Sequence, residues 1–141
     1  MSGFPSLQPA FTVRVDIDVP IAVGAQAGSD LVIVPMLSGT VKSEEGFEPK
    51  LDAELNNDGV IFAMYYKGTV AITPGLVAIL GGQADAKTTD YGESFVTFTF
   101  ETGNVKYQGL QNGVYVAAGH FIVGEGKGTI VEYKVSKVVK G

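Results

Sequence analysis

Hydrophobic and polar residues alternate without interruption over residues 11–19, which read FTVRVDIDV. The five odd-numbered positions carry Phe, Val or Ile, and the four even-numbered positions carry Thr, Arg or Asp. A period of two residues is typical of a β-strand with one buried face and one solvated face. We therefore predict a strand over this segment, with its apolar face toward a core.

Similar segments recur to the end of the chain, separated by turns rich in glycine. We predict further strands over residues 31–41, 51–55, 60–72, 94–101, 114–123 and 129–139. Asn-Asn-Asp-Gly at residues 56–59 predicts a hairpin turn, because these residues tolerate positive φ angles. Pro35 indicates a sheet edge or a bulge in its strand. Residues 23–30 are small and polar, and we expect a loop there.

One short helix is predicted over residues 73–81. Thr73 is a good N-cap, Pro74 fits the first helical position, and Gly81 suits the left-handed position that ends a helix. Together these elements predict an all-β fold: a single antiparallel up-and-down β-barrel of seven or eight strands with one short helix. We expect residues 1–8 to form a flexible arm and residues 9–141 to form the barrel domain.

Composition narrows the class of protein. The 141 residues include ten basic and fifteen acidic side chains, a formal net charge of −5, and no cysteine. An acidic chain without a basic patch argues against nucleic acid and anionic membranes as partners, and the lack of cysteine excludes disulfides and thiolate metal sites. We see no secretory signal and no membrane-spanning run, so we expect a soluble cytoplasmic protein.

Four side chains are candidates for catalysis. His120 is the only histidine, and its unperturbed pKa makes it the natural acid or base near neutral pH. Arg14 is the only arginine and suits bidentate contact with a carboxylate or an enolate, if polar groups line the barrel. A hydrogen-bonded structural role for His120 and a surface position for Arg14 are the alternatives. Tyr65 and Tyr107 add hydroxyl donors.

Apolar and aromatic residues of the predicted strands are candidates for a ligand-binding wall in the barrel lumen. They are Phe62, Met64, Tyr66, Phe98, Phe100, Tyr115 and Tyr133. We expect neither a metal nor a cofactor. Asp16 and Asp18, the one acidic pair on a strand face, could bind a hard cation, but a solvated polar face explains them better. Residues 60–66 are apolar on both faces, and a strand of this kind needs cover from outside its sheet. This pattern predicts a homodimer.

These residues fit three functions. The first is a cofactor-independent isomerase or cyclase that folds a small hydrophobic metabolite in the lumen and stabilises charge on it. The second is a carrier or sensor that binds such a molecule unchanged. The third is a structural or assembly protein whose lumen is filled by its own side chains.

An ordered set of short segments resembles the DUF3237 family, also called UPF0311. The segments that carry the resemblance are Leu7-Gln8-Pro9-Ala10-Phe11, Val34-Pro35, Gly39-Thr40-Val41, Asn57-Asp58-Gly59, Phe100-Glu101-Thr102-Gly103, Tyr107 and residues 116–119. The resemblance implies a small antiparallel β-barrel and no established general activity. Two features depart from the family pattern: no tryptophan lies near Gly109, and the segment at residues 47–57 is short.

Overall fold

The computed structural model describes residues 3–26, 29–55, 62–124 and 128–141. Nine strands, one α-helix and one 3-10 helix follow one another along this part of the chain. They are β1 (Pro5–Ile17), β2 (Ile21–Gln26), β3 (Ser29–Ile33), β4 (Met36–Ser43), β5 (Asp52–Leu55), β6 (Phe62–Val70), α1 (Pro74–Leu80), β7 (Ser94–Thr102), η1 (Val105–Leu110), β8 (Tyr115–Val123) and β9 (Thr129–Lys140). The hairpin turn expected at residues 56–59 lies outside the described residues.

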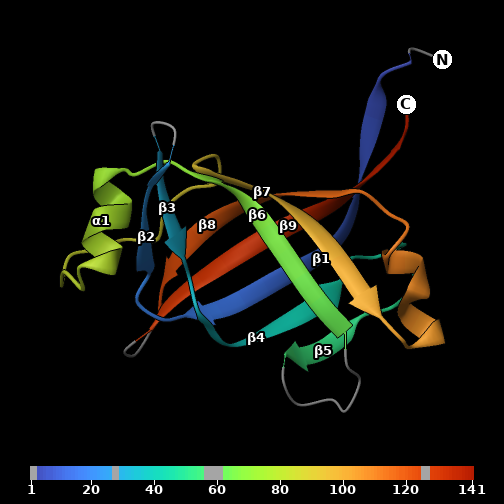
Figure 1. Cartoon of the computed structure of the whole chain (residues 1–141), viewed down its shortest axis with the longest axis horizontal. Coiled ribbons are helices and arrows are strands. Elements are labelled where there is room, and N and C mark those ends of the chain that lie inside the picture. The colour runs from blue at the N-terminus through green and yellow to red at the C-terminus, as the bar shows by residue number, and fades with distance from the viewer. Residues whose placement is uncertain (1–2, 27–28, 56–61, 125–127) are drawn as a thin grey trace.

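Seven strands form one antiparallel sheet in the order β5-β4-β1-β9-β8-β7-β6. The sheet curls into a half-barrel (Figure 1). The prediction of an antiparallel all-β fold with one short helix is therefore confirmed. The edge strands β5 and β6 do not pair with each other within the described residues, so this part of the sheet is open along one side.

The alternation in β1 decides which face of the sheet is inside. Phe11, Val13 and Val15 are completely buried, whereas Arg14 between them faces the opposite, outer side. The same alternation continues in β7, where every second residue from Ser94 to Phe100 is buried. Each of these strands therefore places its apolar side chains on the concave inner face of the half-barrel.

The strand expected over residues 31–41 is divided at Pro35 into β3 and β4, and β3 pairs with β2 in a separate two-stranded sheet. The prediction of a loop over residues 23–30 is thus wrong for most of that segment. Its small residues carry no alternation, because both faces of the hairpin are solvated: Ile21, Val23 and Ile33 are each more than half exposed.

The two ends of the half-barrel are covered by the helices (Figure 1). At one end lies α1, in which Thr73 accepts a hydrogen bond from the backbone N–H of Leu76, as the capping prediction required. The helix ends at Leu80, but Gly81 does not have the left-handed conformation that we expected. Gly81 is right-handed, and the positive φ angle of 65° occurs one residue later, at Gly82. Its buried residues are Leu76 and Ile79. At the opposite end, η1 buries Tyr107 and Leu110.

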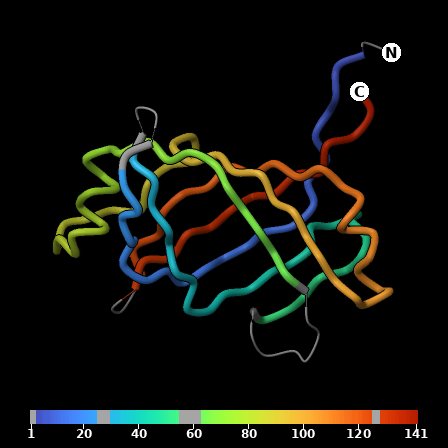
Figure 2. The backbone as a smooth tube through the Cα atoms, in the orientation of Figure 1, coloured from blue at the N-terminus to red at the C-terminus, as the bar shows by residue number. Residues whose placement is uncertain are grey.

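The strand β1 begins at Pro5, inside the segment expected to be a flexible arm. Its first residues pair with the last residues of β9, from Pro5 opposite Lys140 onward. These two strand ends leave the body of the sheet together as a ribbon that carries both chain termini (Figure 2). Within the described residues, no helix combines the length and the apolar character that crossing a membrane requires.

Five aromatic rings fill the interior at the η1 end. Their members, Phe11, Phe47, Phe98, Phe100 and Tyr115, are each at most 3 % exposed. Phe11 contacts the other four rings at centroid distances between 5.6 and 6.4 Å. Tilted and edge-to-face pairs of this kind add about 0.5–1.5 kcal/mol each beyond their buried area. We call this group the aromatic core.

Replacing Gly119 by alanine should destabilise the fold by about 1–3 kcal/mol, because overpacked cores lose stability in that range. A Cβ atom at Gly119 would lie 2.6 Å from the ring of Tyr133, which is itself buried. Gly109 is a matched control, since no atom lies within 4 Å of a Cβ placed there. Urea denaturation of G119A and G109A tests this contact, and equal midpoints would contradict it.

Candidate functional site

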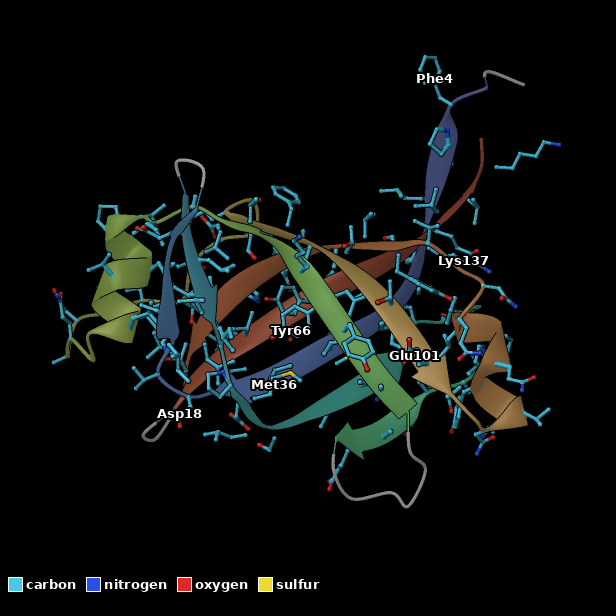
Figure 3. All side chains as sticks on the ribbon, in the orientation of Figure 1. Phe4, Asp18, Met36, Tyr66, Glu101 and Lys137 are labelled. Atoms are coloured by element: carbon cyan, nitrogen blue, oxygen red, sulfur yellow. The ribbon has the colours of Figure 1, made fainter. Side chains whose placement is uncertain are left out.

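The inner face carries a pair of tyrosines beside the aromatic core. Tyr133 reaches across from β9, and its ring lies directly on the backbone of Gly119 in the neighbouring strand β8. Tyr66 comes from the edge strand β6 and stacks on Phe98, with ring centroids 5.2 Å apart. Figure 3 shows Tyr66 extending from β6 over the strands behind it. The rings of Tyr66 and Tyr133 are 5.4 Å apart.

The hydroxyls of Tyr66 and Tyr133 are joined by a hydrogen bond, and both remain protonated. Burial raises the pKa of each phenol, because the apolar interior disfavours the phenolate. Their contact acts to raise the pKa of Tyr133 and to lower that of Tyr66, so Tyr66 is the phenol whose anion this contact favours. Each phenol carries one proton, and the proton that is not used within the pair is available to a molecule bound at this partly buried position.

Ser94 adds a third hydroxyl to the inner face. It lies opposite Gly119 in the β7–β8 register, completely buried, and close enough to Tyr133 to lower the pKa of that phenol. No described atom meets Ser94 Oγ in hydrogen-bonding geometry, however. A buried hydroxyl without a partner costs about 1–3 kcal/mol. We call Tyr66, Tyr133 and Ser94 the inner hydroxyl cluster.

The described inner face supplies donors but no strong base. Residues that point inward from the seven strands include neither a carboxylate nor a histidine within the described residues. The same part of the chain holds no group of three or more His, Asp or Glu side chains that could bind a metal ion. The inner hydroxyl cluster is therefore suited to hold an oxygen atom and to stabilise negative charge on it.

Two of the predicted catalytic residues meet on the outer face of the sheet instead. Arg14, Glu132 and His120 are consecutive cross-strand neighbours on β1, β9 and β8. Glu132 accepts contacts from Arg14 Nε at 3.4 Å and from His120 Nε2 at 3.2 Å. Arg14 thus has the surface position that was the alternative to a lumen position, and His120 likewise faces away from the lumen.

Loop residues complete this outer cluster. Tyr91 donates to Glu132 Oε1 at 2.7 Å and stacks on the ring of His120 at 4.0 Å. His120 Nδ1 lies 2.9 Å from the carbonyl oxygen of Thr89. Burial opposes ionisation of Glu132, but the hydrogen bonds from Tyr91 and His120 and the charge of Arg14 outweigh it and lower its pKa. The hydrogen-bonded histidine fits the structural alternative.

The remaining predicted residues lie in different environments. Tyr65 is 54 % exposed on the outer face, and Tyr107 is buried in η1 under Lys106. Met64 packs beside Tyr66 at the edge of the core. Of the other ligand-binding candidates, Phe98, Phe100 and Tyr115 belong to the aromatic core, where a ligand would have to displace side chains. Phe62 lies in β6, but its side chain is outside the described residues.

Sequence reasoning missed Ser94, Tyr91 and Glu132. Ser94 begins the alternating segment 94–101 and lies on the same face of the strand as Val96 and Phe98. This shared face could have indicated that Ser94 points inward. No comparable signal exists for Tyr91 and Glu132, because their contact depends on how a loop crosses β8 and on the register of three strands.

Comparisons with known proteins agree with the fold. The model of the family described as "Protein of unknown function (DUF3237)" matches residues 5–59 and 51–138. The two matched pieces overlap at residues 51–59, which include the end of the segment 47–57 that we expected to be short. No curated protein matches.

Three crystal structures with 13–18 % sequence identity share the fold. A conserved protein of unknown function from Rhodopseudomonas palustris has a TM-score of 0.65 and 18 % identity, covering 96 % of this chain and 99 % of its own. A protein of unknown function from Clostridium acetobutylicum has a TM-score of 0.57 and 13 % identity, covering 94 % and 99 %. A β-barrel-like protein from Acinetobacter baumannii has a TM-score of 0.57 and 18 % identity, covering 96 % of each chain.

Replacing Glu132 by glutamine should lower the free energy of unfolding at pH 7 by about 1–2 kcal/mol, because hydrogen bonds to a charged group are lost. The pKa of Glu132 is lowered by folding, so its contribution is present above the ordinary value of 4.5 and disappears as the pH falls through the lower folded value. The difference between wild type and E132Q should therefore vanish in acid. Denaturation at several pH values tests this, with the exposed Glu45→Gln as control; a difference that stays constant from pH 7 down to pH 2 would contradict it.

Proposed function

The chain belongs to the DUF3237 family of proteins of unknown function, and we propose that it is a cofactor-independent cyclase or isomerase for a small hydrophobic carbonyl compound. The observation that supports this proposal is the inner hydroxyl cluster. It combines the two paired phenols of Tyr66 and Tyr133, which have one proton to spare between them, with the buried hydroxyl of Ser94 beside Tyr133. Such groups suit an oxygen atom on which negative charge develops.

The open side of the sheet would provide access to this site. Tyr66 projects from β6, which is the sheet edge that does not pair with β5 within the described residues. Phe98 and Tyr133 form apolar walls on two sides of the Tyr66 ring. The aromatic core closes the space toward η1, so the bound molecule would be held beside Tyr66 and would not enter the η1 end.

Cyclisation needs fewer protein groups than proton abstraction. A hydroxyl oxygen of the substrate attacks the substrate's own carbonyl carbon, and the carbonyl π electrons move onto the carbonyl oxygen. Tyr66 donates its hydrogen bond to that oxygen while Tyr133 supports Tyr66. The proton that the nucleophile loses ends on the same oxygen, so no atom is gained or lost. Because the described inner face has no strong base, the site favours this reaction over an isomerisation that begins by removing a proton.

A non-catalytic carrier is the second candidate, because the same donors bind a carbonyl compound without changing it. What favours it is that the described inner face supplies hydrogen-bond donors and no strong base, and binding alone requires no base. The expected homodimer stays a prediction: Met64 and Tyr66 of β6 are covered by the protein's own core, while Tyr65 remains exposed on the outer face.

The first test uses a nitrophenolate, a planar oxyanion that absorbs visible light, as the probe. Tyr66→Phe should weaken its binding about 10- to 100-fold, the range expected for one hydrogen bond to a charged oxygen. Tyr65→Phe is a matched control on the same strand, because that hydroxyl lies on the outer face and should leave binding unchanged. Equal affinity in Y66F and Y65F would contradict a role for Tyr66.

Native mass spectrometry of the protein from its own host would then separate the candidates. A co-purifying carbonyl compound that wild type converts to an isomer of equal mass, and that Y66F converts at least tenfold more slowly, supports the enzyme. Stable binding without conversion supports the carrier. No bound molecule and no nitrophenolate binding would support a structural protein with a filled interior.

A further inference from the structure

A second, apolar groove lies on the outer face of the sheet, on the opposite side from the inner hydroxyl cluster. Its volume is about 500 Å³, and outward-facing residues of β6, β7, β8 and β9 line most of it, with Leu7 of the terminal ribbon at one side. Phe95 and Leu7 are 56 % and 59 % exposed. Val116 and Ala118 form its floor, and their small side chains leave the space open.

The charges around this groove have one sign. Two lysines line it and no carboxylate does, although the chain has fifteen acidic and only ten basic residues. Lys134 directs its ammonium toward β1, where it donates to Thr12 Oγ1 at 2.7 Å and lies 3.4 Å from Glu44. The aliphatic part of the Lys134 side chain therefore lines the groove, and its ammonium does not.

Lys67 is the lysine of the groove whose ammonium is available to pair with a bound molecule. It is an exposed residue of β6, and its ammonium makes no ion pair or hydrogen bond with any group in the described parts of the chain. The nearest outward neighbour across the strand is Thr97, whose hydroxyl donates to the Lys67 carbonyl and not to its side chain. A free ammonium thus stands beside exposed Phe95 and half-buried Val116 and Ala118.

We propose that this groove binds an amphipathic anion, a molecule with an apolar body and one carboxylate-like group. The apolar body lies over Phe95, Val116 and Ala118, and the anionic group pairs with Lys67. Burial of the apolar part supplies most of the affinity, because it removes hydrocarbon from water. The exposed ion pair adds a smaller term and selects anions over neutral molecules. This site is independent of the proposed function, since it uses the other face of the sheet.

Octanoate, octanol and octylammonium are suitable probes, since they share one apolar chain and differ in charge. We expect octanoate to bind about three- to fivefold more tightly than octanol, the range of an exposed ion pair, and octylammonium to bind most weakly. Methyl NMR signals of Val116, Ala118 and Thr97 should shift during titration, while those of inward-facing Val13 should not. Shifts confined to inward-facing methyls would overturn the proposal.

Variants assign the roles within the groove. Lys67→Gln should abolish the preference for octanoate over octanol and leave octanol binding unchanged, whereas Lys87→Gln, outside the groove, should preserve the preference. Phe95→Ser should weaken both ligands at least fivefold. Tyr66→Phe should change neither, which separates this site from the inner one. An unchanged preference in K67Q, or unchanged binding in a folded F95S protein, would overturn the assignment.

Discussion

The pairing of β1 with β9 is the contact on which the rest of the molecule depends. It joins the first strand to the last over twelve residue pairs, from Pro5 opposite Lys140 to Ile17 opposite Thr129. Because side chains alternate with a period of two, a slip of one residue would turn Phe11 and its inward neighbours to water. Both polar clusters depend on the same register, since Tyr133 and Glu132 are adjacent residues of β9 that face opposite sides.

The sheet separates two kinds of chemistry by this alternation. The inner face is apolar, and burial there raises the pKa values of its two phenols, Tyr66 and Tyr133. The outer face is wet, and its charges form rows across neighbouring strands, such as Arg14, Glu132 and His120. Groups that stabilise charge on a bound molecule act most strongly on the inner face, where the local dielectric constant is low.

The alternating segments made much of the fold predictable from sequence. Strands β1, β7, β8 and β9 and the capped helix α1 follow from period and capping alone, because burial on one face imposes those patterns. The hairpin β2–β3 could not be predicted in this way, since neither of its faces is fully buried. The candidate site was only partly predictable. Tyr66 and Tyr133 were among the candidates. The placement of Arg14 and His120 beside Glu132 depends on sheet curvature and strand register, which cannot be read from the alternation of residues.

An open sheet exposes strand edges, and exposed edges invite further strands from other molecules. In the terminal ribbon, β1 has a neighbour on one side only, because its pairing with β4 starts at Phe11. Pro5 and Pro9 fall in this one-sided stretch, and proline has no backbone N–H to offer an incoming strand. At the two sheet edges, β5 is only four residues long and β6 carries Lys67 in its middle. The described edges of the half-barrel are thus protected against fibre-like growth, even though the sheet is not closed.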